Sequence, residues 1–240
     1  MTPERIDKLF AGLGYGSRTE ARKWARAGRI MVNGVCTKDV SQKVDPALLK
    51  IDDEEPDTPG TLMILMNKPA GLVCSHSSSD GPRIYDILPD RWQKRNPPLS
   101  TVGRLDKDTT GAIIITDDTR LVHILSSPKK AVPKVYKIVV DEDISAMSDI
   151  LALRFAAGTI MLENDDRPCL PAKFEPCSDH EFFLTITEGR FHQVKRMCAT
   201  IGLTVDSLHR VSFAGLDTTG LDKGEFREIT LDDIPQELLA

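Results

Sequence analysis

The middle of the chain reads Val102-Gly103-Arg104-Leu105-Asp106-Lys107-Asp108-Thr109-Thr110-Gly111 and continues as Ala112-Ile113-Ile114-Ile115-Thr116. The second part predicts a buried strand, because β-branched residues pack well in a sheet. The first part holds two acids, two bases, two hydroxyls and two glycines. Polar groups beside the end of a strand are a common place for a site. A solvated loop, with Asp108 and Thr109 capping a turn, is the structural alternative.

A second polar cluster spans Glu188–Met197 and reads Glu-Gly-Arg-Phe-His-Gln-Val-Lys-Arg-Met. It follows a strand expected over Glu181–Ile186 and opens a helix expected over Val194–Ile201. An acidic residue is the usual charge in the first turn of a helix. Here basic and hydrogen-bonding groups crowd the turn, which indicates either a site or local stabilisation of the turn.

Residues 61–240 mix strands and helices without a repeated βαβ unit. Further strands are expected over Leu62–Met66 and Val135–Val140, and a further helix over Ile144–Phe155. This pattern favours an α+β fold with a mixed, largely antiparallel sheet.

Residues 1–50 predict two helices and a hairpin. The first helix is marked by apolar residues with helical spacing, namely Ile6, Leu9, Phe10 and Leu13. Ser17 and Glu20 have the spacing of a capping box for a second helix over Thr19–Ala27. Asn33-Gly34, directly after the apolar run Ile30–Val32, is a strong hairpin signal. A helix-turn-helix reader of DNA is the less usual interpretation, because a hairpin follows directly.

Charge divides unevenly along the chain, although the whole chain carries −5. Residues 1–50 hold ten Lys and Arg against five Asp and Glu, a balance of +5. Residues 51–60 hold five acids and no base, together with two prolines and a glycine, which predicts an acidic linker. The basic N-terminal region therefore indicates a polyanion partner, or else a solvated charged face.

Several classes of protein are disfavoured by composition and motifs. The five cysteines form no C-x-x-C pair, which argues against a disulfide framework and against a structural zinc site. Neither nucleotide-phosphate loop motif occurs, and the histidines lack metal-ligand spacing, so we expect no cofactor and no metal. No apolar run reaches the roughly 18 residues of a membrane span, and we expect a monomeric cytoplasmic protein.

Two resemblances follow from these motifs. The N-terminal segments Arg5–Leu9, Ser17–Ala21 and Gly28–Gly34 together resemble the alpha-L RNA-binding module, named after a ribosomal small-subunit protein. The segment Gly103–Gly111 resembles the signature of the pseudouridine synthases, and more narrowly the branch typified by the enzyme RsuA. Further motifs of that branch are matched, in the expected order, by Asn67–Gly71, Ser126–Pro128, Lys134–Lys137 and Glu188–Met197.

The resemblance implies isomerisation of uridine to pseudouridine within RNA. The N1–C1′ bond breaks, the uracil rotates, and C5 is joined to C1′. Asp106 matches the catalytic aspartate, which can attack C1′ or C6 or remove the C2′ proton; the sequence leaves all three open. Lys195 matches the family position that supplies a cation beside this carboxylate. Tyr136 matches the active-site tyrosine, whose ring can stack on uracil.

The remaining predicted site residues concern RNA. The target base must leave its stack, and Arg104 matches the family residue that occupies the space left behind. Arg190 and His192 are expected as RNA contacts or as supports of the site. Phosphate contacts are expected from the basic helix, through Arg18, Arg22, Lys23 and Arg26.

The expected organisation is an RNA-binding module over residues 1–50, an acidic linker over 51–60 and a catalytic domain with a central cleft over 61–240. The expected substrate is small-subunit (16S) ribosomal RNA or a pre-ribosomal particle, and large-subunit (23S) RNA is the alternative within the class. Two alternatives of other classes remain. One is a non-catalytic RNA-binding or ribosome-assembly protein, and the other is a hydrolase using Asp106 with Asp108 as an acid–base pair.

Overall fold

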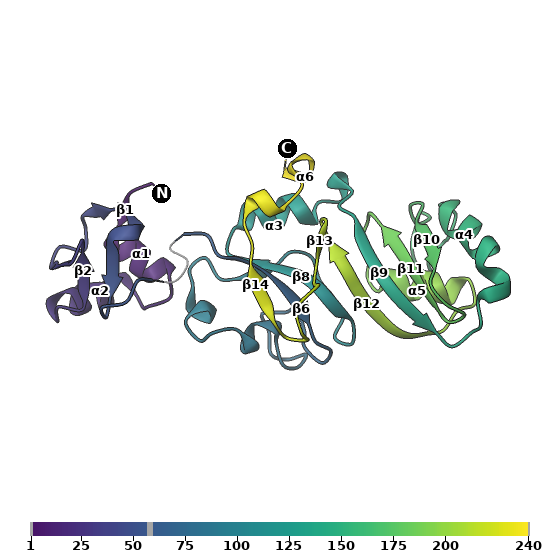
Figure 1. Ribbon diagram of the computed structural model, residues 1–240, viewed down its shortest axis with the longest axis horizontal. Coiled ribbons are helices and arrows are strands. Elements are labelled where there is room, and N and C mark those ends of the chain that lie inside the picture. Colours follow the sequence, from purple (N-terminus) through teal and green to yellow (C-terminus); the bar gives the residue numbers. More distant parts are fainter. Residues whose placement is uncertain (1, 57–59, 240) are drawn as a thin grey trace. The chain divides into compact units, whose positions relative to one another are not determined.

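The computed structural model describes residues 2–56 and 60–239 (Figure 1). Residues 57–59 of the expected acidic linker lie outside the described residues. The chain forms two compact units. The first combines Met1–Met63 with Tyr85–Ser100 and Ile115–Thr119, and the second combines Ile64–Ile84, Thr101–Ile114 and Arg120–Ala240.

The basic helix of the first unit begins as its sequence predicts. It is α2 (Arg18–Arg26), and the Ser17 hydroxyl accepts a hydrogen bond from the Glu20 backbone N–H at 3.2 Å. In return, the Glu20 carboxylate accepts from the Ser17 N–H at 2.7 Å, which completes the capping box. The other elements of this region are α1 (Ile6–Gly12), β1 (Glu4–Arg5), β2 (Ile30–Val32), β3 (Val35–Cys36), β4 (Lys43–Val44), the 3₁₀ helix η1 (Pro46–Leu48) and β5 (Leu49–Ile51).

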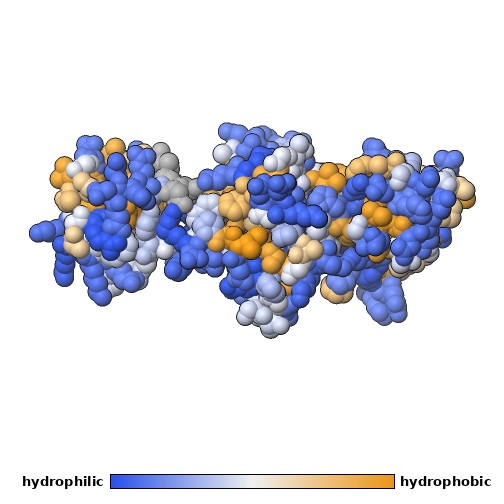
Figure 2. Space-filling view, turned by 60° about the horizontal axis from the view of Figure 1, so that its bottom comes forward, coloured by the Kyte–Doolittle hydropathy of each residue, from blue (hydrophilic) through white to orange (hydrophobic). Residues whose placement is uncertain are grey.

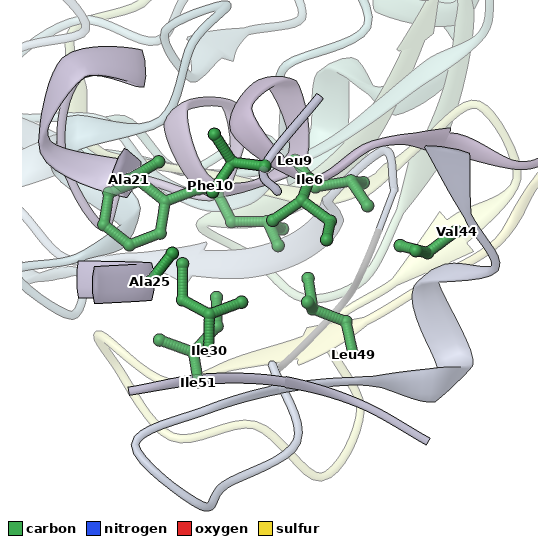
Figure 3. Close-up of a cluster of buried hydrophobic side chains, with 11 residues drawn as sticks. Ile6, Leu9, Phe10, Ala21, Ala25, Ile30, Val44, Leu49 and Ile51 are labelled. Atoms are coloured by element: carbon green, nitrogen blue, oxygen red, sulfur yellow. The ribbon is translucent and has the colours of Figure 1, made fainter. Parts of the chain in front are cut away.

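The predicted hairpin joins β2 and β3, with Val32 opposite Val35. Asn33 and Gly34 both have positive φ, as a two-residue turn of this kind requires. Apolar side chains from the helices and strands share one core (Figure 3). Its members are Ile6, Leu9, Phe10, Leu13, Ala21, Ala25, Ile30, Val40, Val44, Leu49 and Ile51. Because α2 turns its alanines toward this core, its arginines and lysine remain exposed.

A mixed sheet with the strand order β10-β11-β9-β12-β8-β6-β14 organises the rest of the chain. Its strands are β6 (Met63–Lys68), β7 (Ser100–Thr101), β8 (Thr110–Thr116), β9 (Lys134–Val140), β10 (Lys173–Pro176), β11 (Glu181–Ile186), β12 (Val205–Phe213), β13 (Leu216–Asp217) and β14 (Phe226–Glu228). The pair β12–β8 is parallel, whereas β10–β11, β11–β9, β9–β12 and β6–β14 are antiparallel. The expected α+β fold with a largely antiparallel sheet is confirmed.

The remaining helices are α3 (Thr119–Ser126), α4 (Ser148–Ala156), α5 (Gln193–Thr200), α6 (Gln236–Leu239), and the 3₁₀ helices η2 (Ile84–Ile87), η3 (Trp92–Lys94), η4 (Pro128–Lys130), η5 (Ser145–Met147) and η6 (Leu231–Asp233). The helix expected over Ile144–Phe155 is therefore divided into η5 and α4. Strand β12 was not predicted from the sequence. Register shifts between Val205 and Ser207, and between Arg210 and Ser212, interrupt its alternation of buried and exposed side chains.

The surface displayed in Figure 2 is largely hydrophilic, with small hydrophobic patches. Among the described residues, no helix combines the length and the apolar composition needed to cross a bilayer.

The contact between β8 and β12 gives a first prediction. Gly111 has a φ of +107°, and a Cβ there would lie 2.1 Å from the backbone oxygen of Arg210. We expect Gly111→Ala to lower the free energy of unfolding by about 2–3 kcal/mol, because the substitution combines backbone strain with a backbone clash. Urea unfolding measures this loss.

Gly202→Ala is the matched control, because Gly202 has a φ of +86° and no neighbour within 4 Å of an added Cβ. It carries the strain alone, and we expect a loss of about 1–2 kcal/mol. Equal losses in the two variants would show that the approach of β12 to β8 does not require glycine.

Candidate active site

Of the six site residues predicted outside the N-terminal module, five line one cavity of the second unit. The cavity has a volume of about 670 Å³. The predicted residues that it brings together are Arg104, Asp106, Tyr136, Arg190 and His192. They come from the loop before β8, from β9, and from the turn before α5, so the fold joins segments that are distant in sequence.

The loop that carries Asp106 is held by a buried lysine. Lys68, at the end of β6, is fully buried, and its amine donates to the backbone oxygens of Asp106 at 3.1 Å and Thr109 at 2.9 Å. It also donates to the oxygens of Pro69 and Lys107. Burial lowers the pKa of Lys68 below its ordinary value. The backbone from Asp106 to Thr109 is therefore tied to the end of β6.

The expected pairing of Lys195 with Asp106 is replaced by a different one. The Lys195 amine lies 2.5 Å from a carboxylate oxygen of Asp108. Its hydrogen bond and charge lower the pKa of Asp108. Both residues line a second cavity of about 840 Å³, whereas Asp106 lines the first. Asp106 and Asp108 thus face different cavities, and for that reason the lysine meets the second acid.

His192 supplies the basic group beside Asp106. Its Nε2 lies 3.4 Å from the Asp106 carboxylate. The residue adopts the left-handed conformation, with φ 47° and ψ 34°, immediately before α5. Such backbone strain in a residue other than glycine is typical of functional sites. The neighbouring Phe191 ring stacks on the imidazole, with 3.9 Å between centroids, and remains 75% exposed.

Arg190 supports the turn that presents His192. The carboxylate of Glu188, itself buried, accepts hydrogen bonds from the Arg190 guanidinium and from the Gln193 amide. The Gln193 oxygen accepts from the Arg190 backbone N–H at 2.9 Å. Other acceptors of the guanidinium are the Asp165 carboxylate and the backbone oxygens of Arg167 and Pro168. Of the two roles expected for Arg190, these contacts favour support of the site.

The sheet contributes Tyr136 and Arg210, and Arg210 was not predicted as a site residue from the sequence. Tyr136 is buried on β9, and Arg210 lies opposite it on β12. Arg210 is only 1% exposed and also lines the cavity. Arg210 lies between the apolar residues Leu208 and Phe213, and a charged residue inside a buried strand indicates a functional site. This signal could be used only if the strand β12 was predicted first.

Lys134 belongs to the motif Lys134–Lys137, and no role was predicted for it from the sequence. It stands two residues before Tyr136 and lines the same cavity. Burial and the nearby Arg210 lower the pKa of Lys134 to about 8, and Glu188 opposes this change. Among the described residues, no cluster of three or more His, Cys, Asp or Glu side chains could hold a metal ion.

Residues 62–200 match the family model of RNA pseudouridylate synthases, and residues 4–48 match that of the S4 domain. The chain belongs to the RNA pseudouridylate synthase family. It is an RNA pseudouridine synthase, an isomerase, with an N-terminal S4 domain.

Similar proteins match over almost the full chain. The uncharacterized RNA pseudouridine synthase YtzG of Bacillus subtilis is 35% identical, covering 96% of both chains. The ribosomal small subunit pseudouridine synthase A of Vibrio parahaemolyticus is 36% identical over 96% of this chain and 97% of the relative. A crystal structure of a pseudouridylate synthase is 32% identical, with a TM-score of 0.67, covering 98% of this chain and 99% of the other.

The predicted RNA contacts of this pseudouridine synthase fall in both units. Arg104 is exposed at the first cavity, directly after Gly103 with its positive φ. Arg18, Arg22, Lys23 and Arg26 lie on α2 in the S4 domain and are exposed.

The buried amine gives a second prediction. In Lys68→Met, the oxygens of Asp106 and Thr109 lose their donor while remaining in the interior. We expect the free energy of unfolding to fall by about 1–3 kcal/mol. We also expect pseudouridine formation to fall further than the loss of folded protein explains. Urea unfolding and tritium release from C5-labelled uridine in RNA measure the two effects.

Lys129→Met, at an exposed lysine of η4, is the control and should change neither quantity. Full turnover in folded Lys68→Met would show that the loop keeps its geometry without the amine.

Proposed function

We propose that this enzyme converts one uridine of small-subunit (16S) ribosomal RNA into pseudouridine, with Asp106 as the catalytic carboxylate acting on a flipped base. The observation that carries the proposal is the cavity in which Asp106, Tyr136 and Arg104 meet. The choice of RNA is supported by relatives of Vibrio parahaemolyticus and Escherichia coli named ribosomal small subunit pseudouridine synthase A, which are 36% and 34% identical to this chain.

Asp106 has the surroundings that a covalent or proton-abstracting carboxylate requires. Its side chain is partly exposed to the cavity, while Lys68 fixes its backbone oxygen. A fixed backbone limits the positions of the carboxylate, and positioning of reacting groups supplies a large part of enzymatic rate enhancement. His192 stands at the same carboxylate and carries a favourable charge when it is protonated.

Arg104 and Tyr136 fit the two positions that base flipping creates, namely the place that the base leaves in its stack and the pocket that receives it. Removing a base from its stack costs on the order of a few kcal/mol. Arg104, exposed beside the cavity, can occupy the vacated place with its planar guanidinium. Tyr136, buried in the cavity wall, can stack on the extruded uracil.

The S4 domain supplies affinity in this proposal. Exposed cations along α2 fit the phosphates of ribosomal RNA, free or in a pre-ribosomal small-subunit particle. The functional division is an RNA-binding module over residues 1–50, a linker over 51–60 and a catalytic domain over 61–240. Since ribosomal RNA is the proposed substrate, we propose that the enzyme acts in the cytoplasm, as a monomer.

The third prediction tests the reaction and the target together. A strain without the gene should lack one pseudouridine in 16S RNA, and the wild-type gene should restore it. Asp106→Asn should bind RNA as the wild type does but restore no pseudouridine, because the amide can neither form the covalent bond nor take the proton. Chemical mapping of pseudouridine in 16S and 23S RNA measures the outcome.

Asp166→Asn, at an exposed acid, is the isosteric control and should restore the modification fully. A restored site in 23S RNA would exclude the proposed target but keep the enzyme class. Turnover by Asp106→Asn would exclude Asp106 as the catalytic carboxylate.

The fourth prediction concerns α2. In the double variant Arg22→Gln and Arg26→Gln, the slope of the logarithm of RNA affinity against the logarithm of salt concentration should become shallower by about 1.4–1.8. The turnover rate on saturating RNA should not change. Arg154→Gln combined with Lys173→Gln removes two exposed charges of the second unit and serves as the control. Equal effects of the two double variants would show that net charge, and not α2, determines the affinity.

A further inference from the structure

Two further cations line the active-site cavity: Arg210, which is buried, and Lys134, which is half-buried. Arg210 is 1% exposed, and its Nε donates to the backbone oxygen of Ala112 at 2.6 Å. Its Nη2 is buried and has no hydrogen-bond partner among the residues that the structure describes. Lys134 donates to the oxygen of Val132 at 2.8 Å. A buried donor without a partner is costly, and this one lines a cavity that must receive a polar substrate.

The sheet places both cations beside Tyr136. Arg210 is paired with Tyr136 across β12 and β9. Lys134 is two residues before Tyr136, so its side chain leaves the same face of β9. All three residues line the cavity that Asp106 also lines. A uracil stacked on Tyr136 would therefore lie within the same group of side chains as the two cations.

The reaction develops negative charge on the uracil by each route open to Asp106. If the carboxylate bonds to C1′, the N1–C1′ electron pair stays on N1 and spreads to O2 and O4. If it removes the C2′ proton, the C2′–H pair forms the C1′–C2′ double bond, and the N1–C1′ pair again leaves with the uracil. If it bonds to C6, the C5–C6 π pair moves through C4 to O4. Negative charge therefore reaches a carbonyl oxygen of the uracil in every case.

We propose that Arg210 and Lys134 form an oxyanion site that binds a carbonyl oxygen of the flipped uracil and stabilises the negative charge which develops there. This inference rests on the proposed role of the cavity as the place of reaction, but not on which atom Asp106 attacks. Donors fixed in advance at the position of developing charge are among the largest single contributions to enzymatic rates. The unpartnered nitrogen of Arg210 provides such a donor in a place shielded from water.

The test compares single-turnover rates on saturating RNA. We expect Lys134→Met and Arg210→Met each to lower the rate by about 10²-fold, with RNA affinity unchanged. Lys137→Met is the matched control. Lys137 belongs to the same strand, leaves its opposite face, and pairs with Glu181 at 2.9 Å. It should keep the wild-type rate.

A conservative variant gives a second readout. The charged groups that face Lys134 are Arg210 from β12 and Glu188 from the segment before α5, and together with burial they leave its pKa at about 8. The amine is charged below that value, so kcat/KM of the wild type should decline as pH rises above about 8. Lys134→Arg keeps its charge throughout this range and should remove that decline.

Each outcome separates this inference from the proposed function. Wild-type turnover that is abolished by Asp106→Asn but unaffected by Lys134→Met would keep the proposed function and overturn the oxyanion site. Weaker RNA binding at an unchanged single-turnover rate would also overturn it, because the cations would then hold phosphate. Should Arg210→Met fail to fold, the two Lys134 variants decide the question by themselves.

Discussion

The active site of this pseudouridine synthase depends on a lysine that the fold has taken out of water. Lys68 is fully buried, and its amine is shared among backbone oxygens of the loop that carries Asp106. An isolated ammonium group in the interior would be strongly unfavourable, so the loop carbonyls must stay turned toward it. The requirement acts in both directions: the lysine orders the loop, and the loop solvates the lysine. A segment rich in polar residues thereby acquires a fixed geometry directly before a central strand.

The sequence predicts those parts of the molecule whose signals are contiguous. The capping box at Ser17 and Glu20, the Asn33-Gly34 turn and the strand Glu181–Ile186 all follow from residues a few positions apart, and the structure confirms them. The motif around Asp106 is equally local. Strand β12 is different, because two register shifts break its alternation and only its pairing with β9 and β8 reveals which side chains are buried. Arg210 was missed for that reason.

The pairing of Lys195 shows what a sequence motif does not predict. A motif indicates which residue types gather at a site, but not which of two nearby carboxylates a given amine meets. Asp106 and Asp108 are separated by a single residue, yet they line different cavities. Lys195 reaches Asp108, while His192 reaches Asp106 because a left-handed residue turns the chain just before α5. These directions depend on backbone conformation at single residues, which no spacing rule supplies.

The arrangement of charged side chains in the site is explained if the substrate becomes negatively charged in the cavity during the reaction. Arg190 and Glu188 satisfy each other and hold the turn, and Lys195 satisfies Asp108. In the wall that carries Tyr136, Arg210 keeps a buried nitrogen without a partner in the described part of the chain, and Lys134 lines the same cavity beside it. A partner within the protein for the free nitrogen of Arg210 would make the fold more stable. That this nitrogen remains open toward the cavity is the arrangement expected of a group whose partner is the changing charge of a substrate.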